Sequence, residues 1–156
     1  MKPYYRKATV RDGDLVAKNI RVEDLREVEG LGLNRSSIPF SVLISEPAVA
    51  FFNKEHEICG VAGITPDYKS IDAGLIWMIC TPALQKNPHT FVKEARRWLS
   101  EQRGYSLLWN IADSRNTLHL KLLKLLGFKA IREVPVGPNN LPYIEIVKLC
   151  ACQPQL

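Results

Sequence analysis

The residues best suited to chemistry lie on one predicted helix, in the segment "SRNTLHLKLLKLLG" at residues 114–127. His119 comes three residues after Asn116 and four before Leu123, so the three side chains share one helical face. An imidazole exchanges protons near neutral pH, which makes His119 a candidate general base. A lone helical histidine is more often structural, and Asn116 is explained equally well as the N-cap of the helix.

Other titratable residues are less well placed. His56 lies in the charged turn "NKEHE", where we expect it to be solvated, and His89 precedes a predicted helix as a neighbour of its cap. Four acidic residues lie near predicted strand ends, and their spacing singles out none as a base: Glu55, Glu57, Asp67 and Asp72.

The cysteines predict neither a metal site nor disulfides. They form no CxxC pair and have no ligand spacing with the histidines. Cys59 and Cys80 lie in strand-like runs and are expected to be small buried residues in a reducing compartment. Cys150 and Cys152 fall in a short polar tail and are expected to be free thiols.

Length and composition indicate one folded domain, residues 1–149, followed by a tail at residues 150–156. With 46% hydrophobic and 24% charged residues, the chain has the composition of an ordinary soluble protein. No apolar run reaches the roughly 18–20 residues that span a bilayer. The first residues, "MKPYYRKATVRDGD", lack the apolar region of a signal peptide.

The net charge of +5 belongs to the second half of the chain. Residues 80–156 hold 11 basic and 5 acidic side chains, whereas residues 1–79 hold 10 and 11. An anionic partner, such as the phosphates of CoA or DNA, could bind there, although no recognition motif accompanies the charges and a solvated or subunit-facing surface is the simpler interpretation. Six residues of two predicted helices and the start of the following strand carry much of the charge: Lys93, Arg96, Arg97, Lys121, Lys124 and Lys129.

The apolar patterns predict an α/β fold with a mixed sheet and helices on both faces. The expected order is a strand, two helices, three strands, a helix, a strand, a helix and two strands. We expect Asp12 to cap the first helix, and Leu25, Val28 and Leu31 to form the apolar face of the second. The pattern leaves open whether a short helix follows "SIPF" at residues 37–40.

Two further elements of this pattern concern the centre of the sheet. The apolar run "AGLIWMIC", residues 73–80, predicts a central strand buried on both faces. We expect the helix that follows to begin near His89 or Thr90 and to bury one stripe of side chains: Phe91, Ala95, Trp98 and Leu99.

This order of elements, with Asn116 opening the last helix and Gly127-Phe128 following it, resembles the GNAT acetyltransferase superfamily. The resemblance implies that residues 73–80 diverge from a neighbouring strand at residues 105–112 and that acyl-CoA lies in the gap. It also implies a loop of type (Q/R)-x-x-G-x-(G/A), whose backbone N–H groups hold the pyrophosphate. Four residues are then candidates for contacting the cofactor: Trp77, Ile79, Asn116 and Phe128. For Trp77, ordinary core packing is the alternative.

The chain departs from the superfamily pattern at the residues that carry its chemistry. The segment "TPALQKNPHTF" contains no glycine, and Pro82 and Pro88 remove two backbone donors. His119 replaces a small residue. Leu123 stands where many members have a tyrosine that protonates the leaving thiolate, and leucine has no proton to donate.

Four segments also resemble small GNAT-like proteins of short-tailed phages, the internal virion protein A type. They are "RKATVRDGDLVAKNIRVEDLRE", "IWMICT", "PHTFVKEARRWL" and "LWNIADSRNTLHLKLLKLLGF". This resemblance implies a role in the virion or in DNA ejection, with localisation in the virion and the host cytoplasm. It also implies other virion proteins or further copies of the chain as partners.

The sequence therefore supports two main hypotheses. The first is a virion-associated protein on a degenerate GNAT-like fold, without catalysis and without a bound cofactor. The alternative is a divergent acyl-CoA-dependent N-acetyltransferase with His119 or an acidic residue as base. A weaker third hypothesis, DNA contact through the basic second half, rests on charge alone.

Overall fold

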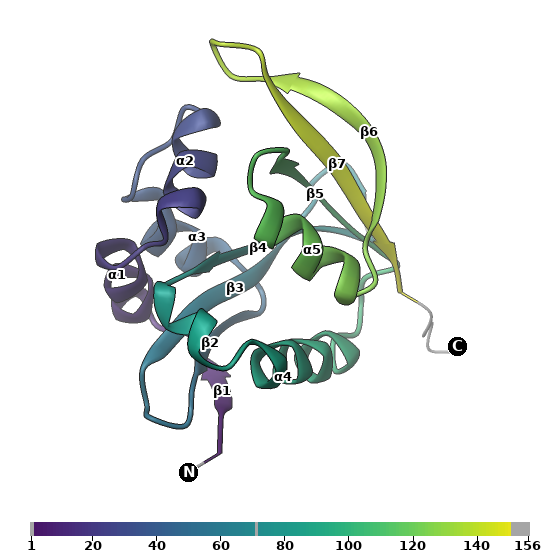
Figure 1. Cartoon of the computed structure of the whole chain (residues 1–156). Coiled ribbons are helices and arrows are strands. Elements are labelled where there is room, and N and C mark those ends of the chain that lie inside the picture. The colour runs from purple at the N-terminus through teal and green to yellow at the C-terminus, as the bar shows by residue number, and fades with distance from the viewer. Residues whose placement is uncertain (1, 71, 151–156) are drawn as a thin grey trace, which may run out of the picture.

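The computed structural model describes residues 2–70 and 72–150, which form a seven-stranded mixed sheet covered by helices (Figure 1). Along the sheet the strand order is β1-β2-β3-β4-β5-β7-β6. The strands are β1 (Tyr4–Lys7), β2 (Ala48–Phe52), β3 (Ile58–Pro66), β4 (Ala73–Cys80), β5 (Leu107–Asp113), β6 (Lys129–Val136) and β7 (Leu141–Leu149). The helices in this part of the chain are α1 (Val10–Lys18), α2 (Val22–Gly30), α3 (Ser37–Ile44), α4 (Pro88–Ser100) and α5 (Thr117–Leu125), with a 3-10 helix, η1 (Pro82–Lys86).

The central strands β4 and β5 diverge, as the sequence predicted. They are parallel and pair only where Ala73–Leu75 lies beside Leu107–Trp109, at the start of both strands. All other neighbouring strands in the described sheet pair in antiparallel fashion. A gap therefore opens between the carboxyl-terminal halves of β4 and β5.

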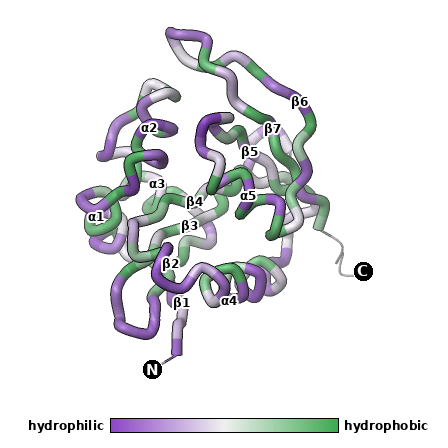
Figure 2. Tube along the Cα trace, in the orientation of Figure 1, coloured by the Kyte–Doolittle hydropathy of each residue, from purple (hydrophilic) through white to green (hydrophobic). Residues whose placement is uncertain are grey.

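Helices cover both faces of the sheet, as expected. The larger core packs Phe91 and Trp98 of α4 and Leu122 of α5 against one face. The smaller core packs Val16 of α1 and Val42 of α3 against the other face. Figure 2 shows hydrophobic residues concentrated along the central strands between these two layers. In the part of the chain that the structure describes, no helix is long and apolar enough to cross a membrane.

Two details of the helices near the N-terminus differ from prediction. Thr9, and not Asp12, caps α1. Asp12 is the third helical residue, and its side chain accepts a hydrogen bond from the Thr9 backbone N–H in a capping box. The segment "SIPF" is itself part of α3, because Pro39 lies in the first helical turn, where a missing N–H costs nothing. One side of α3 remains exposed, at Phe40, Leu43 and Ile44.

Helix α4 is close to the prediction. It begins at Pro88, one residue before the expected start, because proline suits the first helical position. The side chains of Phe91, Ala95 and Trp98 are buried as predicted, and Leu99 is half-buried. Thr90 does not cap the helix with its side chain; its hydroxyl donates to the Asn87 carbonyl.

One burial prediction was wrong, and one was met in part. Of the apolar face expected for the second helix, Val28 is buried in α2, whereas Leu25 and the following Leu31 are half-buried. Strand β4 is not buried throughout, since Trp77 and Ile79 are only half-buried. Cys59 and Cys80 are buried free thiols as expected. Cys152, with the rest of residues 151–156, lies outside the described residues.

Candidate functional site

Helix α2 places two carboxylates across the gap between the diverging strands. Asp24 Oδ2 accepts from the backbone N–H of Cys80 at 2.8 Å, at the end of β4. Glu27 Oε1 accepts from the backbone N–H of Asp113 at 3.2 Å, at the end of β5. Strands that diverge lose ladder partners, and buried N–H groups need acceptors. The buried face of α2 is acidic because it supplies them.

Asn116 joins these two carboxylates. Its Nδ2 donates to Asp24 Oδ1 at 2.9 Å and to Glu27 Oε2 at 2.8 Å. Its Oδ1 accepts from the backbone N–H of His119 at 3.3 Å, which confirms Asn116 as the N-cap of α5. The side chain is held from both ends in the interior, since Asn116 is only 2% exposed.

Two basic groups balance the carboxylates. His119 Nδ1 lies 3.0 Å from Glu27 Oε2, and Arg21 Nη1 donates to Asp24 Oδ1 at 3.0 Å. Burial acts to lower the pKa of His119, but the charge and hydrogen bond of Glu27 outweigh it, so the pKa is raised. Burial also raises the pKa of Asp24, and the nearby His119 and Arg21 charges offset only part of that effect. We call Arg21, Asp24, Glu27, Asn116 and His119 the gap cluster.

The gap cluster is not a good metal site. Ligand atoms of Asp24, Glu27 and His119 lie within 4.8 Å of one another, a spacing that an ion could bridge. However, Arg21 and Asn116 already donate hydrogen bonds to these carboxylates. The Arg21 guanidinium, with a side chain 5% exposed, would repel a cation placed beside it. The donor set therefore fits a closed polar network better than an ion.

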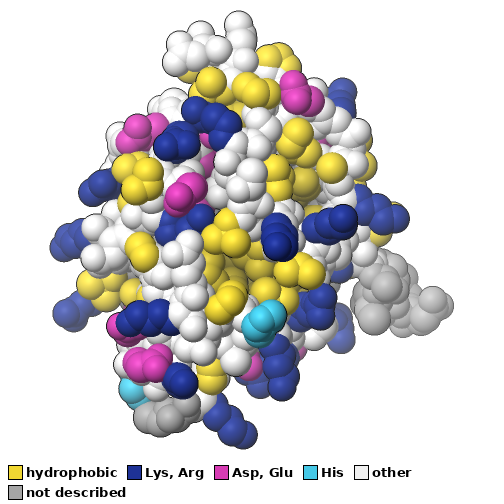
Figure 3. Space-filling model, viewed as in Figure 1, with side chains coloured by type: hydrophobic (Ala, Val, Ile, Leu, Met, Phe, Trp, Pro, Cys, Tyr) yellow, Lys and Arg dark blue, Asp and Glu magenta, His cyan; other side chains and the backbone are white. Residues whose placement is uncertain are grey.

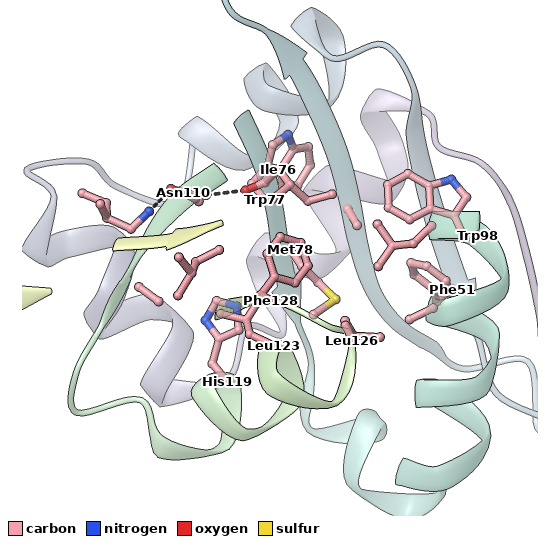
Figure 4. A pocket seen from close by; sticks show the side chains of 16 residues that line it. Phe51, Ile76, Trp77, Met78, Trp98, Asn110, His119, Leu123, Leu126 and Phe128 are labelled. Atoms are coloured by element: carbon pink, nitrogen blue, oxygen red, sulfur yellow. Dashed lines mark hydrogen bonds between the residues drawn. The ribbon is translucent and has the colours of Figure 1, made fainter. Parts of the chain in front are cut away.

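A small cavity lies beside the gap cluster, between β4 and β5 (Figure 4). Its volume is about 40 Å³, far below the roughly 300–1,000 Å³ of clefts that enclose drug-sized ligands. The Asn110 side chain donates to the Ile76 carbonyl and so ties the diverging strands together. Trp77, Leu123 and Phe128 also line the cavity, and His119 reaches it from α5 while its Nδ1 stays on Glu27.

The structure thus brings together some of the sequence candidates and separates others. His119 and Phe128 meet at the cavity, and Trp77 of β4 contributes to its lining. The Trp77 indole also donates to Ser45 Oγ at 2.8 Å, as the packing interpretation requires. Trp77 and Ile79 both pack against the smaller core. Asn116 is enclosed by carboxylates away from the cavity lining.

Sequence reasoning missed Asp24, Glu27 and Asn110. Asp24 and Glu27 are three residues apart on the same side of α2, a spacing that was visible but that also suits an exposed helix face. Asn110 interrupts the apolar run of β5, and a polar residue within a central strand is itself a signal.

The remaining polar candidates lie elsewhere. His56 contacts Tyr4, with Nδ1 3.2 Å from the tyrosine oxygen, and His89 is exposed at the start of α4. Glu57 pairs with Lys86 at 2.7 Å. Asp67 accepts from the backbone N–H of Lys69 in a turn. Among the residues that the structure describes, the cavity lining includes none of these side chains, and it includes neither Glu55 nor Asp72.

The segment after β4 does not fit a pyrophosphate. The N–H groups of Thr81, Ala83 and Leu84 are bonded within the protein, to Cys59 O, Thr81 Oγ1 and Thr81 O. Pro82 and Pro88 have no N–H to offer. The Lys86 ammonium is held by Glu57. The 3-10 helix η1 therefore follows β4 at the place where the resemblance implies an anion-binding loop, and the donors of Ala83 and Leu84 are already used within the protein.

No family model matches the sequence, and no curated protein matches it. Solved structures share the fold. They include the acetyltransferase of GNAT family from Streptococcus pneumoniae, with 18% identity over 95% of this chain and 99% of that chain and a TM-score of 0.65. The GNAT-family acetyltransferase from Bacillus anthracis has 13% identity, coverages of 96% and 95%, and a TM-score of 0.70. Spermidine N-acetyltransferase from Vibrio cholerae, in complex with CoA and spermine, has 10% identity, coverages of 95% and 95%, and a TM-score of 0.68.

These likenesses establish the fold and nothing finer. The mixed sheet with diverging central strands is that of GNAT acetyltransferases, as the sequence predicted. Identities of 10–18% leave activity and partners to be argued from the residues of this chain.

Proposed function

We propose that this chain is a GNAT-fold protein that has lost its acyl-CoA site and acts by binding other proteins, as a virion-associated component of the kind its sequence resembles. The single observation that carries the proposal is the segment from Thr81 to Pro88. There the N–H groups of Thr81, Ala83 and Leu84 bond within the protein, and the two prolines have no N–H to donate. The virion role itself is supported by the four sequence segments and not by the structural likenesses.

The energetic argument concerns the pyrophosphate. One charge-assisted hydrogen bond contributes about 1.5–3 kcal/mol net, so tight binding of two phosphates needs several converging donors. Lysines are flexible point charges and do not replace a fixed nest of N–H groups. Leu123, buried at the cavity, also has no proton for a departing thiolate.

A divergent N-acetyltransferase is the second candidate, and two observations favour it. The gap between β4 and β5 is retained, and solved structures with this fold are acetyltransferases. His119 would be the base, oriented by Glu27 and facing the cavity. For a substrate to enter, the hydrogen bond from Asn110 to Ile76 would have to break.

Titration with acetyl-CoA separates the two candidates. We expect no heat of binding and no thermal shift, whereas a ligand at 100 times its dissociation constant would stabilise the fold by about 2.7 kcal/mol. The same preparation is then assayed for acetylation of a panel of amines. His119→Gln is the matched variant, since it removes the candidate base and keeps a hydrogen-bond donor.

The outcomes discriminate plainly. Low-micromolar binding with turnover that His119→Gln abolishes would establish the acetyltransferase and overturn the proposal. The virion role is tested separately, by mass spectrometry of purified particles of the phage that encodes the chain. Absence of the chain from intact particles would refute that part.

A further inference from the structure

We propose that the groove between η1, α4 and α5 binds an acidic, amphipathic helix of a partner protein. This inference rests on the proposed function, because it requires the chain to act by binding another protein. It adds the location of the binding surface and the chemistry of the partner.

The groove is apolar and open on one side. Its volume is about 320 Å³, and its lining residues are Leu84, Gln85, Pro88, His89, Val92, Leu118, Lys121, Leu122 and Leu125. Leu84 and Leu122 are buried at its base, whereas Leu118 and Leu125 remain 37% and 47% exposed. Figure 3 shows hydrophobic side chains gathered between α5 and the η1–α4 segment, on the face seen in Figure 1.

Helix α5 explains why this surface is apolar. Leu123 and Leu126, at its end, face the core of the sheet. Leu118, Leu122 and Leu125 form a second apolar stripe, spaced four and three residues apart, which lies along the groove. A helix that is apolar on two sides is normally covered on both. The spacing and the trough between two helices suit a third helix with its own apolar stripe.

The border of the groove is basic. Neither η1 nor α5 contains an acidic residue. Lys121 lies in the lining, and Lys93 and Lys124 are exposed on the two bordering helices. The one acidic residue of α4, Glu94, is paired with Arg97 and lies toward Phe51 and Tyr4. A partner helix with carboxylates beside its apolar stripe complements this charge, and a basic one would be repelled.

One contact holds the two walls together. The Arg96 guanidinium on α4 donates twice to the Leu125 carbonyl at the end of α5, at 3.0 and 2.7 Å. This bond satisfies a carbonyl that the end of the helix leaves without a partner. It also fixes the spacing of α4 and α5, so the groove exists before a partner arrives and little ordering cost is added on binding.

The test uses a fluorescent model peptide of about 18 residues, helical over five turns, with leucines along one stripe and glutamates on the flanks. The control peptide has lysine in place of every glutamate. By fluorescence anisotropy we expect the acidic peptide to bind, and its affinity should fall as the salt concentration is raised. The lysine peptide should bind at least about tenfold more weakly than the acidic peptide.

Variants locate the site. Leu118→Ser and Lys121→Glu should each weaken binding of the acidic peptide by about tenfold or more. The first change removes an apolar contact, and the second reverses a charge. Leu43→Ser on α3 and Lys69→Glu in the turn after β3 are matched controls at exposed positions, and they should change nothing. Circular dichroism confirms that each variant is folded.

The remaining outcomes contradict the inference in distinguishable ways. It would be overturned if both peptides bound equally well. It would also be overturned if the control variants lost as much affinity for the acidic peptide as the groove variants. Sedimentation showing that the groove variants abolish self-association of the chain would overturn it too, because a second copy would then be the occupant. Failure of both the peptide and acetyl-CoA to bind would refute this inference alone. Displacement of the peptide by acetyl-CoA would refute the proposed function as well.

Discussion

Replacing Asn116 with aspartate tests the gap cluster most directly. The change keeps the size of the side chain and the oxygen that caps α5, but it removes the amide that donates to Asp24 at 2.9 Å and Glu27 at 2.8 Å. Two charge-assisted hydrogen bonds are lost, at about 1.5–3 kcal/mol each. We therefore expect Asn116→Asp to lower the free energy of unfolding by about 3–6 kcal/mol at pH 7.5. That is a large share of the roughly 5–15 kcal/mol of a typical domain.

The pH dependence has a definite sign. The carboxylates of Asp24 and Glu27 raise the pKa of the carboxyl introduced at position 116 in the folded state. The folded variant therefore binds more protons than the unfolded chain. Its stability then falls as pH rises. The destabilisation relative to wild type should be smaller at pH 5 than at pH 7.5, because a protonated carboxyl can again donate one hydrogen bond.

Urea unfolding, followed by circular dichroism at both pH values, measures the effect. Asn87→Asp is the matched control: Asn87 also precedes a helix, α4, but makes no side-chain cap bond. An aspartate at a helix N-terminus is mildly favourable, so this variant should be neutral or slightly more stable. If Asn116→Asp matched wild type within about 0.5 kcal/mol at pH 7.5, the carboxylates would not lie beside Asn116 and the docking of α2 would be refuted.

Three further predictions concern stability. Trp98→Ala should cost about 3–5 kcal/mol in urea unfolding, because it empties a buried aromatic site against Phe51; an unchanged midpoint would place Trp98 on the surface. The raised pKa of His119 implies that its stabilising pair with Glu27 is present below about pH 6.5 and is lost as pH rises through the folded pKa. The stability advantage of wild type over His119→Gln should therefore shrink between pH 6 and pH 9, and parallel profiles would contradict this pairing. Tyr143→Phe should cost about 1–3 kcal/mol, because it leaves the Glu27 carbonyl without its 2.6 Å donor; a shift no larger than that of an exposed tyrosine variant, Tyr68→Phe, would argue against that bond.

The features that depend on neighbouring residues could be predicted from the sequence. The order of the elements followed from apolar spacing, and the cap at Asn116 from a side chain that bonds three residues ahead. The absence of a glycine loop after β4 was visible because it depends on which residues occur in one short segment. The fold class followed from these local features together with the family resemblance.

The composition of the candidate site could not be predicted in this way, because its residues are distant in the sequence. The carboxylates of α2 meet Asn116 and His119 across 89 to 92 positions of the chain, and Asn110 meets Ile76 across 34. In the sequence, acidic residues on one side of a short helix are equally compatible with a solvent-exposed face. They became a buried cluster because the diverging strands left N–H groups that Asp24 and Glu27 of α2 satisfy.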